Sequence, residues 1–462
     1  MQSLRLLCLA MAASVLPAQP APGPPRRVFP IRSGPIGNGG WKARPPLWTR
    51  GRYLEAPQTT TTTGTPYVSP SQMQSIYGLS LVEYTTTIAI VDAYDSPNAE
   101  SDLNFFSNNY GLPPCTTANG CFTKVDQDGK KVYPIRNSEW EQEINLDTQW
   151  VHAMAPSSNI LLVEAKSESN TDLFAAVSYA KLHASVVAMS WGGPEMCGQG
   201  QYDTTVFYQA GVTFVAASGD KGDTISYPAS SPNVIAVGGT SFAVNSQGYI
   251  ILPVVETAWN DADGGSGGGC SLYTPQPAFQ RGWLPSSCTT RGTPDVALDG
   301  DPASGVQVYI SRQGGWFILG GTSLSAQLFA AIVADVNGYR TSTYFKTASP
   351  TLYMLLPQLY SLAGRSYATY FKDITGGGGP LSAGPGWDFV TGLGSPIGSM
   401  LMNYLTAVKQ PPILPAPVKP DARLSAAQSP GCIALGPAPH RGRGGAGAGA
   451  DAGRATRIRT LT

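Results

Sequence analysis

The sequence predicts an α/β fold with a largely parallel central β-sheet and helices on both of its faces. Apolar runs of strand length alternate with helical patterns along most of the chain. Strands that are separated by helices need crossover connections, which are typical of parallel pairing and of a sheet buried on both faces. We assign strands to residues 86–92, 159–165, 184–190, 212–217 and 234–237.

Three helices follow from residue spacing. Residues 140–155 place Trp140, Ile144 and Val151 along one side of a helix. A second helical pattern covers residues 171–183, and an alanine-rich helix is expected to begin at Ser323.

Both ends of the chain differ from its middle in composition. Residues 1–20 combine a positive start with a short apolar core, which predicts a secretory signal peptide and therefore export. Residues 21–65 are rich in Pro, Gly and Thr and are expected to be a linker or a remnant pro-segment. Residues 66–408 form the main domain, and residues 409–462 are expected to be a disordered, low-complexity tail.

Charge and cysteine content narrow the class of protein. The 462 residues include 30 basic and 30 acidic side chains, so there is no electrostatic footprint for nucleic acid. No later apolar run is long enough to cross a membrane, and we expect an exported monomer. Cysteines fit export, and proximity along the chain pairs Cys115 with Cys121 and Cys270 with Cys288, leaving Cys197 over.

The sequence GGTS at residues 320–323 is the candidate nucleophile site. An apolar run at residues 315–319 enters a glycine turn, after which the helix begins. A serine at a strand-to-helix turn has an exposed hydroxyl, and the positive end of the helix favours a developing oxyanion. An ordinary helix N-cap is the alternative interpretation of Ser323, since Thr and Ser are favoured there.

The usual base of such a serine is missing. Among the three histidines, His440 lies in the tail, His183 ends a helical pattern, and His152 has apolar neighbours. If Ser323 is a nucleophile, its base is therefore expected to be a carboxylate, which remains useful in acid where imidazole is already protonated.

Glu143 and Asp147 are the candidate carboxylates. They stand at positions i and i+4 of the helix at residues 140–155, on one face, where two close carboxyl groups should share a proton. A solvated acidic helix face is the alternative. Asp220 ends the sequence SGD after a buried strand, where it is either a turn residue or a protonated donor to an oxyanion.

These motifs resemble those of the sedolisins, the serine-carboxyl peptidases, which have a subtilisin-like fold. The resemblance covers roughly residues 65–408 and includes YPASSP at 227–232, VGGT at 237–240 and PDVA at 294–297. It implies an endopeptidase that cleaves peptides or unfolded proteins in acid through an acyl-enzyme, with residues 66–408 as the catalytic domain. The implied roles are nucleophile for Ser323, general base and acid for Glu143, orienting partner for Asp147, and oxyanion-hole carboxyl for Asp220.

The resemblance also implies one structural Ca²⁺ near the end of the domain. Asp373 and Asp388 lie in glycine-rich segments, and two carboxylates with backbone carbonyls suit a hard cation. Matching positions make Ile374, Gly384 and Gly386 the carbonyl donors. A glycine-rich loop that uses aspartates as turn residues is the alternative.

Two features depart from the family's pattern. Gln327 stands where the family usually has proline; we expect this position in the first turn of the helix and the effect of glutamine to be local. Sedolisins typically carry a long folded propeptide, whereas residues 1–65 precede the domain here, which leaves maturation open.

Two other functions are alternatives to a serine-carboxyl peptidase. An ordinary subtilisin-type protease would use Asp92 at a strand end, but no matching histidine follows it. A catalytically inactive, secreted protease-like binding module is the second alternative.

Residues 190–193 and 266–269 are expected to form the edges of a substrate cleft that pair with an extended peptide. Trp191 either narrows a subsite or packs inside the protein. The substrate-binding candidates are Ser190, Trp191, Gly192, Ser266, Gly267 and Gly268.

Overall fold

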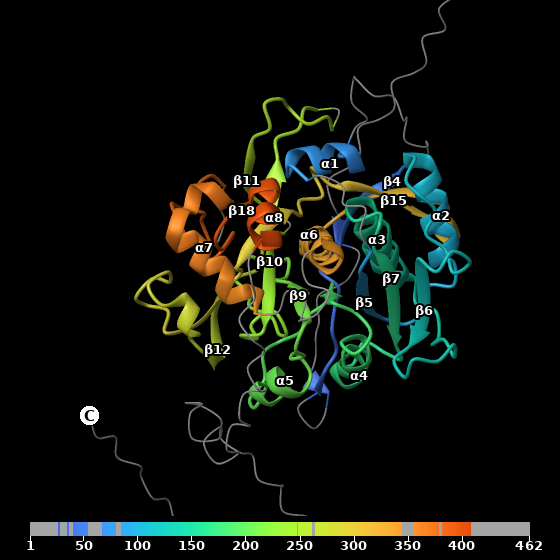
Figure 1. Ribbon diagram of the computed structural model, residues 1–462, viewed down its shortest axis with the longest axis horizontal. Helices are drawn as coiled ribbons and strands as arrows, with labels where there is room; N and C mark the ends of the chain where they lie inside the picture. Colours follow the sequence, from blue (N-terminus) through green and yellow to red (C-terminus); the bar gives the residue numbers. More distant parts are fainter. Residues whose placement is uncertain are drawn as a thin grey trace, which may run out of the picture.

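A largely parallel sheet of eight strands forms the centre of the molecule (Figure 1). Its order is β11-β10-β9-β8-β5-β7-β6, with β14 also paired to β10, and only the β10–β11 pairing is antiparallel. The predicted α/β class is therefore confirmed. The strands are β5 (Thr87–Ala93), β6 (Phe122–Asp126), β7 (Asn159–Ala165), β8 (Val186–Met189), β9 (Thr213–Ala217), β10 (Val234–Phe242), β11 (Glu256–Ala258) and β14 (Val296–Asp299).

The computed structural model describes part of the chain. The described residues are 26–27, 35–36, 40–53, 67–79, 85–246, 248–260, 264–343, 354–377 and 381–407. The expected signal peptide at 1–20 and the whole of the expected tail at 409–462, with His440, lie outside them.

Helices cover both faces of the sheet. Along β5, Ile88 and Ile90 belong to one hydrophobic core, whereas Ala89 and Val91 belong to a second core on the other face. Alternate side chains of a strand point to opposite faces, so both faces of the sheet are buried, as expected for parallel strands. Helices α3 and α6 contribute to the first core, and α4 contributes to the second.

Helix α6 lies near the centre of the molecule, between α3 and α8 (Figure 1). It begins at Thr322, one residue before the expected start. Among the described residues, no helix has the length and apolarity needed to cross a bilayer. The helices are α1 (Pro70–Ile76), α2 (Ala99–Tyr110), α3 (Ser138–Met154), α4 (Asn170–Ala180), α5 (Gly200–Thr205), α6 (Thr322–Thr343), α7 (Leu355–Tyr370) and α8 (Gly398–Ala407).

A second, antiparallel sheet leads into α6. Its order is β1-β4-β16-β15, and β16 (Gly315–Gly320) ends directly before the turn into the helix. Strand β4 (Trp48–Tyr53) comes from the stretch that we expected to be a linker or pro-segment. The remaining strands are β1 (Arg26–Arg27), β2 (Pro35–Ile36), β3 (Gly40–Trp41), β12 (Gly269–Pro275), β13 (Thr290–Thr293), β15 (Val306–Ile310), β17 (Phe371–Lys372) and β18 (Ser395–Pro396).

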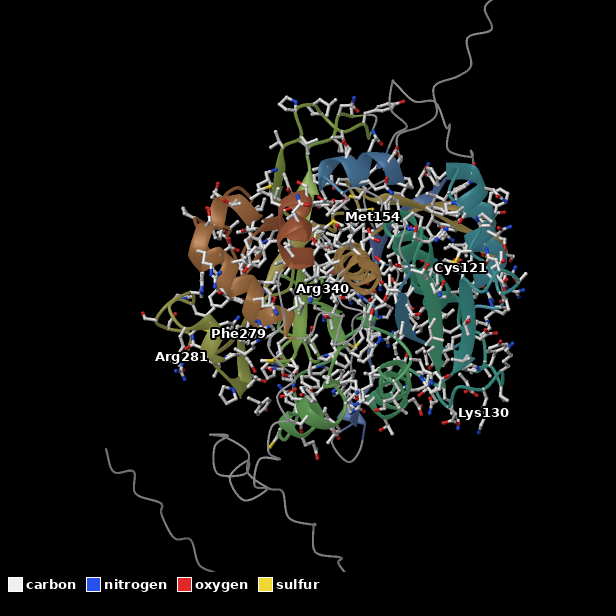
Figure 2. The ribbon with its side chains drawn as sticks, in the orientation of Figure 1. Cys121, Lys130, Met154, Phe279, Arg281 and Arg340 are labelled. Atoms are coloured by element: carbon white, nitrogen blue, oxygen red, sulfur yellow. A yellow bond between two sulfur atoms is a disulfide. The ribbon has the colours of Figure 1, made fainter. Side chains whose placement is uncertain are left out.

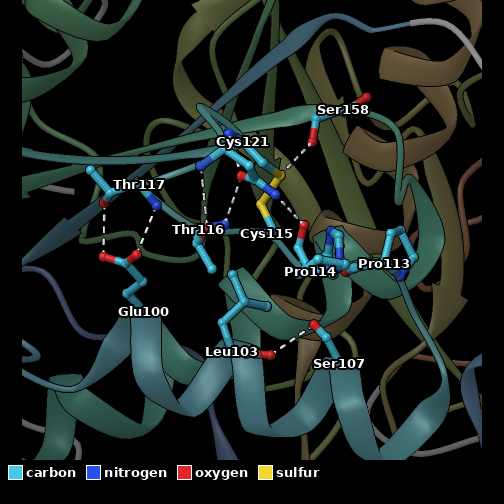
Figure 3. Close-up of a disulfide and its surroundings, with 12 residues drawn as sticks. Glu100, Leu103, Ser107, Pro113, Pro114, Cys115, Thr116, Thr117, Cys121 and Ser158 are labelled. Carbon is cyan, nitrogen blue, oxygen red and sulfur yellow. Dashed lines mark hydrogen bonds between the residues drawn. A yellow bond between two sulfur atoms is a disulfide. The ribbon is translucent and has the colours of Figure 1, made fainter.

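Both disulfides expected from proximity are present. Cys115 is bonded to Cys121, and Cys270 is bonded to Cys288. Figure 3 shows the first of these at the base of a loop whose Thr117 donates two hydrogen bonds to Glu100. The expectation that Cys197 is left over was wrong, because it is disulfide-bonded as well.

A buried ion pair fastens the β13–β14 connection to the rest of the fold. Arg291 and Asp295 are both fully buried, with Nη2 and Oδ2 2.5 Å apart. Asp295 also accepts hydrogen bonds from the backbone of Ala236 in β10 and from the hydroxyl of Tyr360 in α7, each at 2.8 Å. The carboxylate of Asp295 therefore binds groups from three separate elements, β10, β13 and α7.

We predict that Arg291→Met lowers the free energy of unfolding by about 3–5 kcal/mol, because it leaves Asp295 as a buried charge without its cation. Arg281→Met is the matched control: Arg281 is exposed and points away from the body of the molecule in Figure 2, so its replacement should cost less than about 0.5 kcal/mol. Urea denaturation of the two variants measures both values, and similar losses would contradict the prediction.

Candidate active site

Ser323 lies where β16 passes through a glycine turn into α6. Gly321 has φ 131°, and a Cβ there would lie 1.9 Å from the carbonyl oxygen of Pro46, so only glycine fits. Ser323 is the second residue of α6 and is fully buried, in contrast to the exposed hydroxyl that we expected. The helix N-terminus still places its unpaired backbone N–H groups and positive end beside the serine.

Helix α3 presents Glu143 and Asp147 to this serine. Its N-cap, Asn137, accepts hydrogen bonds from the N–H groups of Glu139 and Trp140 at 2.9 and 3.2 Å, which fixes where the helix starts. Glu143 and Asp147 have no exposed surface, so the alternative of a solvated acidic face does not hold. The two residues instead point into the interface between α3 and α6.

Burial raises the pKa of Glu143 well above its usual value, and the negative charge of Asp92 raises it further. The nearby hydroxyl of Ser323 and the side chain of Asp147 oppose this increase by hydrogen bonding. Among the described residues, Ser323 Oγ and the two Glu143 carboxyl oxygens have no hydrogen-bond partner, although the Ser323 hydroxyl is close enough to act on the pKa of Glu143. Catalytic hydrogen bonds are often long or poorly aligned before substrate binds.

Both carboxylate oxygens of Asp147 accept hydrogen bonds from neutral side chains. Oδ1 accepts from Ser190 Oγ at 3.0 Å, and Oδ2 accepts from Gln327 Nε2 at 2.6 Å. Burial raises the pKa of Asp147 well above its usual value, the charges of Asp92 and Glu143 add to this, and the bond from Ser190 opposes it.

Asp92 is a third buried carboxyl at the same place. It stands near the carboxyl end of β5, and burial raises its pKa to about 8. The parallel register of Ile90 with Ala188 puts Asp92 beside Ser190, two residues further along each strand. Sequence reasoning considered Asp92 only as a subtilisin-type aspartate; a buried strand that ends in a carboxylate was the available signal.

Asp220 is tied to the residue that precedes the serine. Its Oδ1 accepts hydrogen bonds from the backbone N–H and the hydroxyl of Thr322 at 2.9 and 2.8 Å. The N–H of Gly219 donates to the Thr322 hydroxyl at 3.0 Å. The loop after β9 is thereby fixed to the N-terminus of α6. We missed Thr322 as a functional residue, although its place in GGTS was a signal.

The described histidines make other contacts. His152 Nε2 lies 2.8 Å from the carbonyl oxygen of Pro113, and burial lowers its pKa. His183 Nδ1 lies 2.8 Å from the carbonyl oxygen of Tyr179. Neither ring is hydrogen-bonded to Ser323, so a carboxyl base is the arrangement that this site offers.

A cleft of about 500 Å³ lies beside Asp220, whereas Ser323, Glu143 and Asp147 are not among the residues that line it. Gly192, Gly268 and Asp220 line it, as the expected cleft edges require. The Gly267 N–H donates to the Gly219 carbonyl at 2.6 Å and joins two of the loops around the cleft.

Three of the expected substrate-binding side chains point elsewhere. Ser190 contacts Asp147, and Ser266 Oγ donates to the Val390 carbonyl at 2.6 Å. Trp191 is buried in the core, where its Nε1 donates to the Val91 carbonyl at 2.7 Å, so it packs inside and does not narrow a subsite.

The chain's own N-terminal residues form one wall of this cleft. Arg44 and Gly192 pair as an antiparallel bridge: the Arg44 N–H donates to the Gly192 carbonyl at 3.2 Å, and the Gly192 N–H donates back at 3.5 Å. Trp41 packs against Trp191 and Phe174 next to this bridge. The edge at Gly192 is therefore able to pair with an extended backbone.

The expected calcium ligands converge on one turn. The Gly386 N–H donates to Asp373 Oδ2 at 3.0 Å, and the Gly384 N–H donates to Asp388 Oδ2 at 3.1 Å. Both carboxylates therefore lie at the turn that carries two of the expected carbonyl donors, and Ile374 follows Asp373 directly. This set of hard oxygen donors fits a calcium ion.

The chain is similar to several known proteins. A model described as the subtilase family matches residues 135–348. Kumamolisin of Bacillus sp. (strain MN-32) is 38% identical over 57% of this chain and 50% of its own length, and sedolisin of Pseudomonas sp. (strain 101) is 28% identical over 71% and 59%. The chain thus spans about half of the length of the curated relatives it matches.

The fold agrees with that of a solved relative. The structure of Pseudomonas sedolisin, a serine-carboxyl proteinase, matches with a TM-score of 0.62 and 27% identity, over 74% of this chain and 99% of that one. In sequence and in fold, the chain is therefore similar to the sedolisins, which are serine-type peptidases.

Proposed function

We propose that the protein is a secreted endopeptidase that hydrolyses peptide bonds in acid through an acyl-enzyme on Ser323. The observation that carries this proposal is the meeting of Ser323 with the buried carboxyl of Glu143 at the interface of α3 and α6. Unfolded proteins and peptides are the substrates that fit a cleft whose edge pairs with an extended backbone. The protein acts as a monomer.

Each group has one task in the reaction. Glu143 takes the hydroxyl proton while Ser323 Oγ attacks the carbonyl carbon, and the tetrahedral oxyanion is stabilised by the N-terminus of α6 and by protonated Asp220. Glu143 then gives its proton to the leaving amine as the C–N bond breaks. Water then attacks the acyl-enzyme ester while Glu143 takes its proton, and Glu143 returns a proton to Ser323 Oγ as the acid product leaves. Asp147 orients Glu143 and shares its proton.

The carboxyl pair explains why acid is the working range. Two buried carboxyls that lie close together lose their two protons in separate steps, the second only at higher pH. Between the two steps, the pair holds one shared proton. The neutral pair, present in strong acid, cannot accept the proton of Ser323. The singly ionised pair can, and Asp220 must still be protonated to donate to the oxyanion.

We further propose that residues 40–53 belong to a pro-segment that must leave the cleft. Arg44 pairs with Gly192 as an extended substrate would, and Pro46 lies against the turn before Ser323. This supports a precursor whose own chain blocks the site until cleavage in the segment that follows.

One calcium ion is proposed for the turn near the end of the domain. Asp373 and Asp388 would supply carboxylates, and Ile374, Gly384 and Gly386 would supply carbonyl oxygens. The ion would fix the loop that includes Val390, whose carbonyl accepts from Ser266 beside the cleft. Its contribution is structural.

We predict that Ser323→Ala and Glu143→Gln each reduce kcat/KM for an unfolded protein substrate by on the order of 10³ or more, because each removes one member of the proton-transfer pair. His152→Ala is the control and should retain activity within about threefold, since its ring bonds a backbone carbonyl. Activity that peaks in acid and is lost in the first two variants supports the mechanism. Loss in His152→Ala would favour an ordinary subtilisin-type protease, and a folded wild type without activity would favour a binding module.

We predict that a synthetic peptide of residues 40–53 inhibits the processed enzyme competitively, because its backbone fits the edge at Gly192. The same peptide with Arg44→Pro lacks the donating N–H and should bind at least about fivefold more weakly. An Arg44→Ala peptide is the control, because it removes the same side chain and keeps the donating N–H. Inhibition constants measured by steady-state kinetics decide the matter, and equal values for all three peptides would rule out this pairing.

We predict that removing calcium with a chelator lowers the melting temperature and that added Ca²⁺ restores it. Binding at about 100 times the dissociation constant stabilises a fold by about 2.7 kcal/mol. Asp388→Asn should abolish the response, whereas Asp128→Asn, an exposed aspartate elsewhere, should keep it. Scanning calorimetry measures the shifts; an Asp388→Asn variant that still responds would disprove the site.

A further inference from the structure

Gln327 departs from the family's pattern and contacts the acidic pair directly. Helix α6 begins at Thr322, so Gln327 is its sixth residue. We had expected Gln327 in the first turn of the helix, but it lies beyond that turn. Its side chain is fully buried, with Nε2 2.6 Å from Asp147 Oδ2 and 2.9 Å from Ser190 Oγ. We expected glutamine at this position to have only a local effect on the helix, but its side chain donates a hydrogen bond to a carboxyl of the candidate active site.

The position of Gln327 follows from helix geometry. Residues four apart lie on one face of a helix, so Gln327 stands one turn above Ser323 on α6, as Asp147 stands one turn above Glu143 on α3. The two helices therefore meet in two levels. Ser323 faces Glu143 at the first level, and Gln327 contacts Asp147 at the second.

The hydrogen bonds around Asp147 form a closed ring. Ser190 donates its only hydroxyl hydrogen to Asp147 Oδ1 and accepts from Gln327 Nε2, whose second hydrogen goes to Asp147 Oδ2. Both amide hydrogens are used, and both oxygens of the carboxylate accept. This arrangement favours the ionised form of Asp147, because a carboxylate that accepts several hydrogen bonds loses its proton more readily.

We propose that Gln327 is a positioning residue that stabilises the ionised form of Asp147 relative to its protonated form and so lowers the pH at which the Glu143–Asp147 pair releases its first proton. A proline at this position has no side-chain donor and leaves one oxygen of Asp147 without this bond. The charged groups that act on Asp147 are Asp92 from β5 and Glu143 from α3, and Asp220 after β9 acts on Glu143. The neutral donors are Ser190, which directly follows β8, and Gln327 of α6. The inference rests on the proposed function.

The test compares the full chain with two variants that lack the donor. Gln327→Met keeps the length of the side chain, and Gln327→Pro introduces the residue that the family usually has, so at least one should fold. The pH profile of kcat/KM is expected to shift its acidic limb upward by about one unit in both variants, a tenfold loss on that limb. The plateau should stay within about threefold.

Gln149→Met is the matched control. Gln149 is also buried, lies two residues after Asp147 on α3, and donates to the Tyr309 carbonyl at 2.8 Å without contacting the acidic pair. Its replacement should lower stability but leave the acidic limb in place. An unmoved limb in both Gln327 variants, or an equal shift in Gln149→Met, would overturn the proposal.

A measurement without substrate separates failure of this inference from failure of the proposed function. Because Gln327 stabilises ionised Asp147, the melting temperature of Gln327→Met should fall further below wild type as pH rises, and approach it in strong acid. For Gln149→Met the difference should not depend on pH. A wild type without Ser323-dependent hydrolysis would refute the function, whereas a pH-independent difference for Gln327→Met would refute the role of Gln327.

Discussion

Burial of several carboxyl groups in one place is the constraint on which the site depends. Asp92, Glu143 and Asp147 are fully buried, and burial raises all three pKa values, that of Asp92 to about 8. Groups with raised pKa values bind protons more tightly in the folded chain. The resulting stability is present below their ordinary pKa, 3.8 for Asp92, and is lost as the pH rises through about 8. These three carboxyls therefore favour the folded state more in acid than at neutral pH.

The N-terminus of α6 organises the groups around these acids. Thr322 binds Asp220, Ser323 faces Glu143, and Gln327 binds Asp147. One rigid helix therefore sets three relationships that the chain brings together from distant positions. Since β16 leads into this helix and β4 pairs with β16, strand β4 is connected through β16 to the turn before Ser323.

The sequence predicted the fold class and five central strands because long apolar runs and crossovers have few other solutions. It also predicted the i, i+4 relation of Glu143 and Asp147. It did not predict the short strands β6, β11 and β14, whose few residues carry little periodic signal. Trp191 kept two interpretations because aromatic residues suit both cores and subsites, and only its contacts in the core decided between them.

By itself, the sequence determined which chemical groups are present: a serine at a strand-to-helix turn, a carboxyl pair on one helix face and no histidine in a matching context. Only the tertiary structure decided their environment. Periodicity does not reveal which face of a helix is covered, so burial of the acids could not be read from spacing. The contact between Gln327 and Asp147 joins residues 180 positions apart, and such a distance is set only when α3 and α6 pack together.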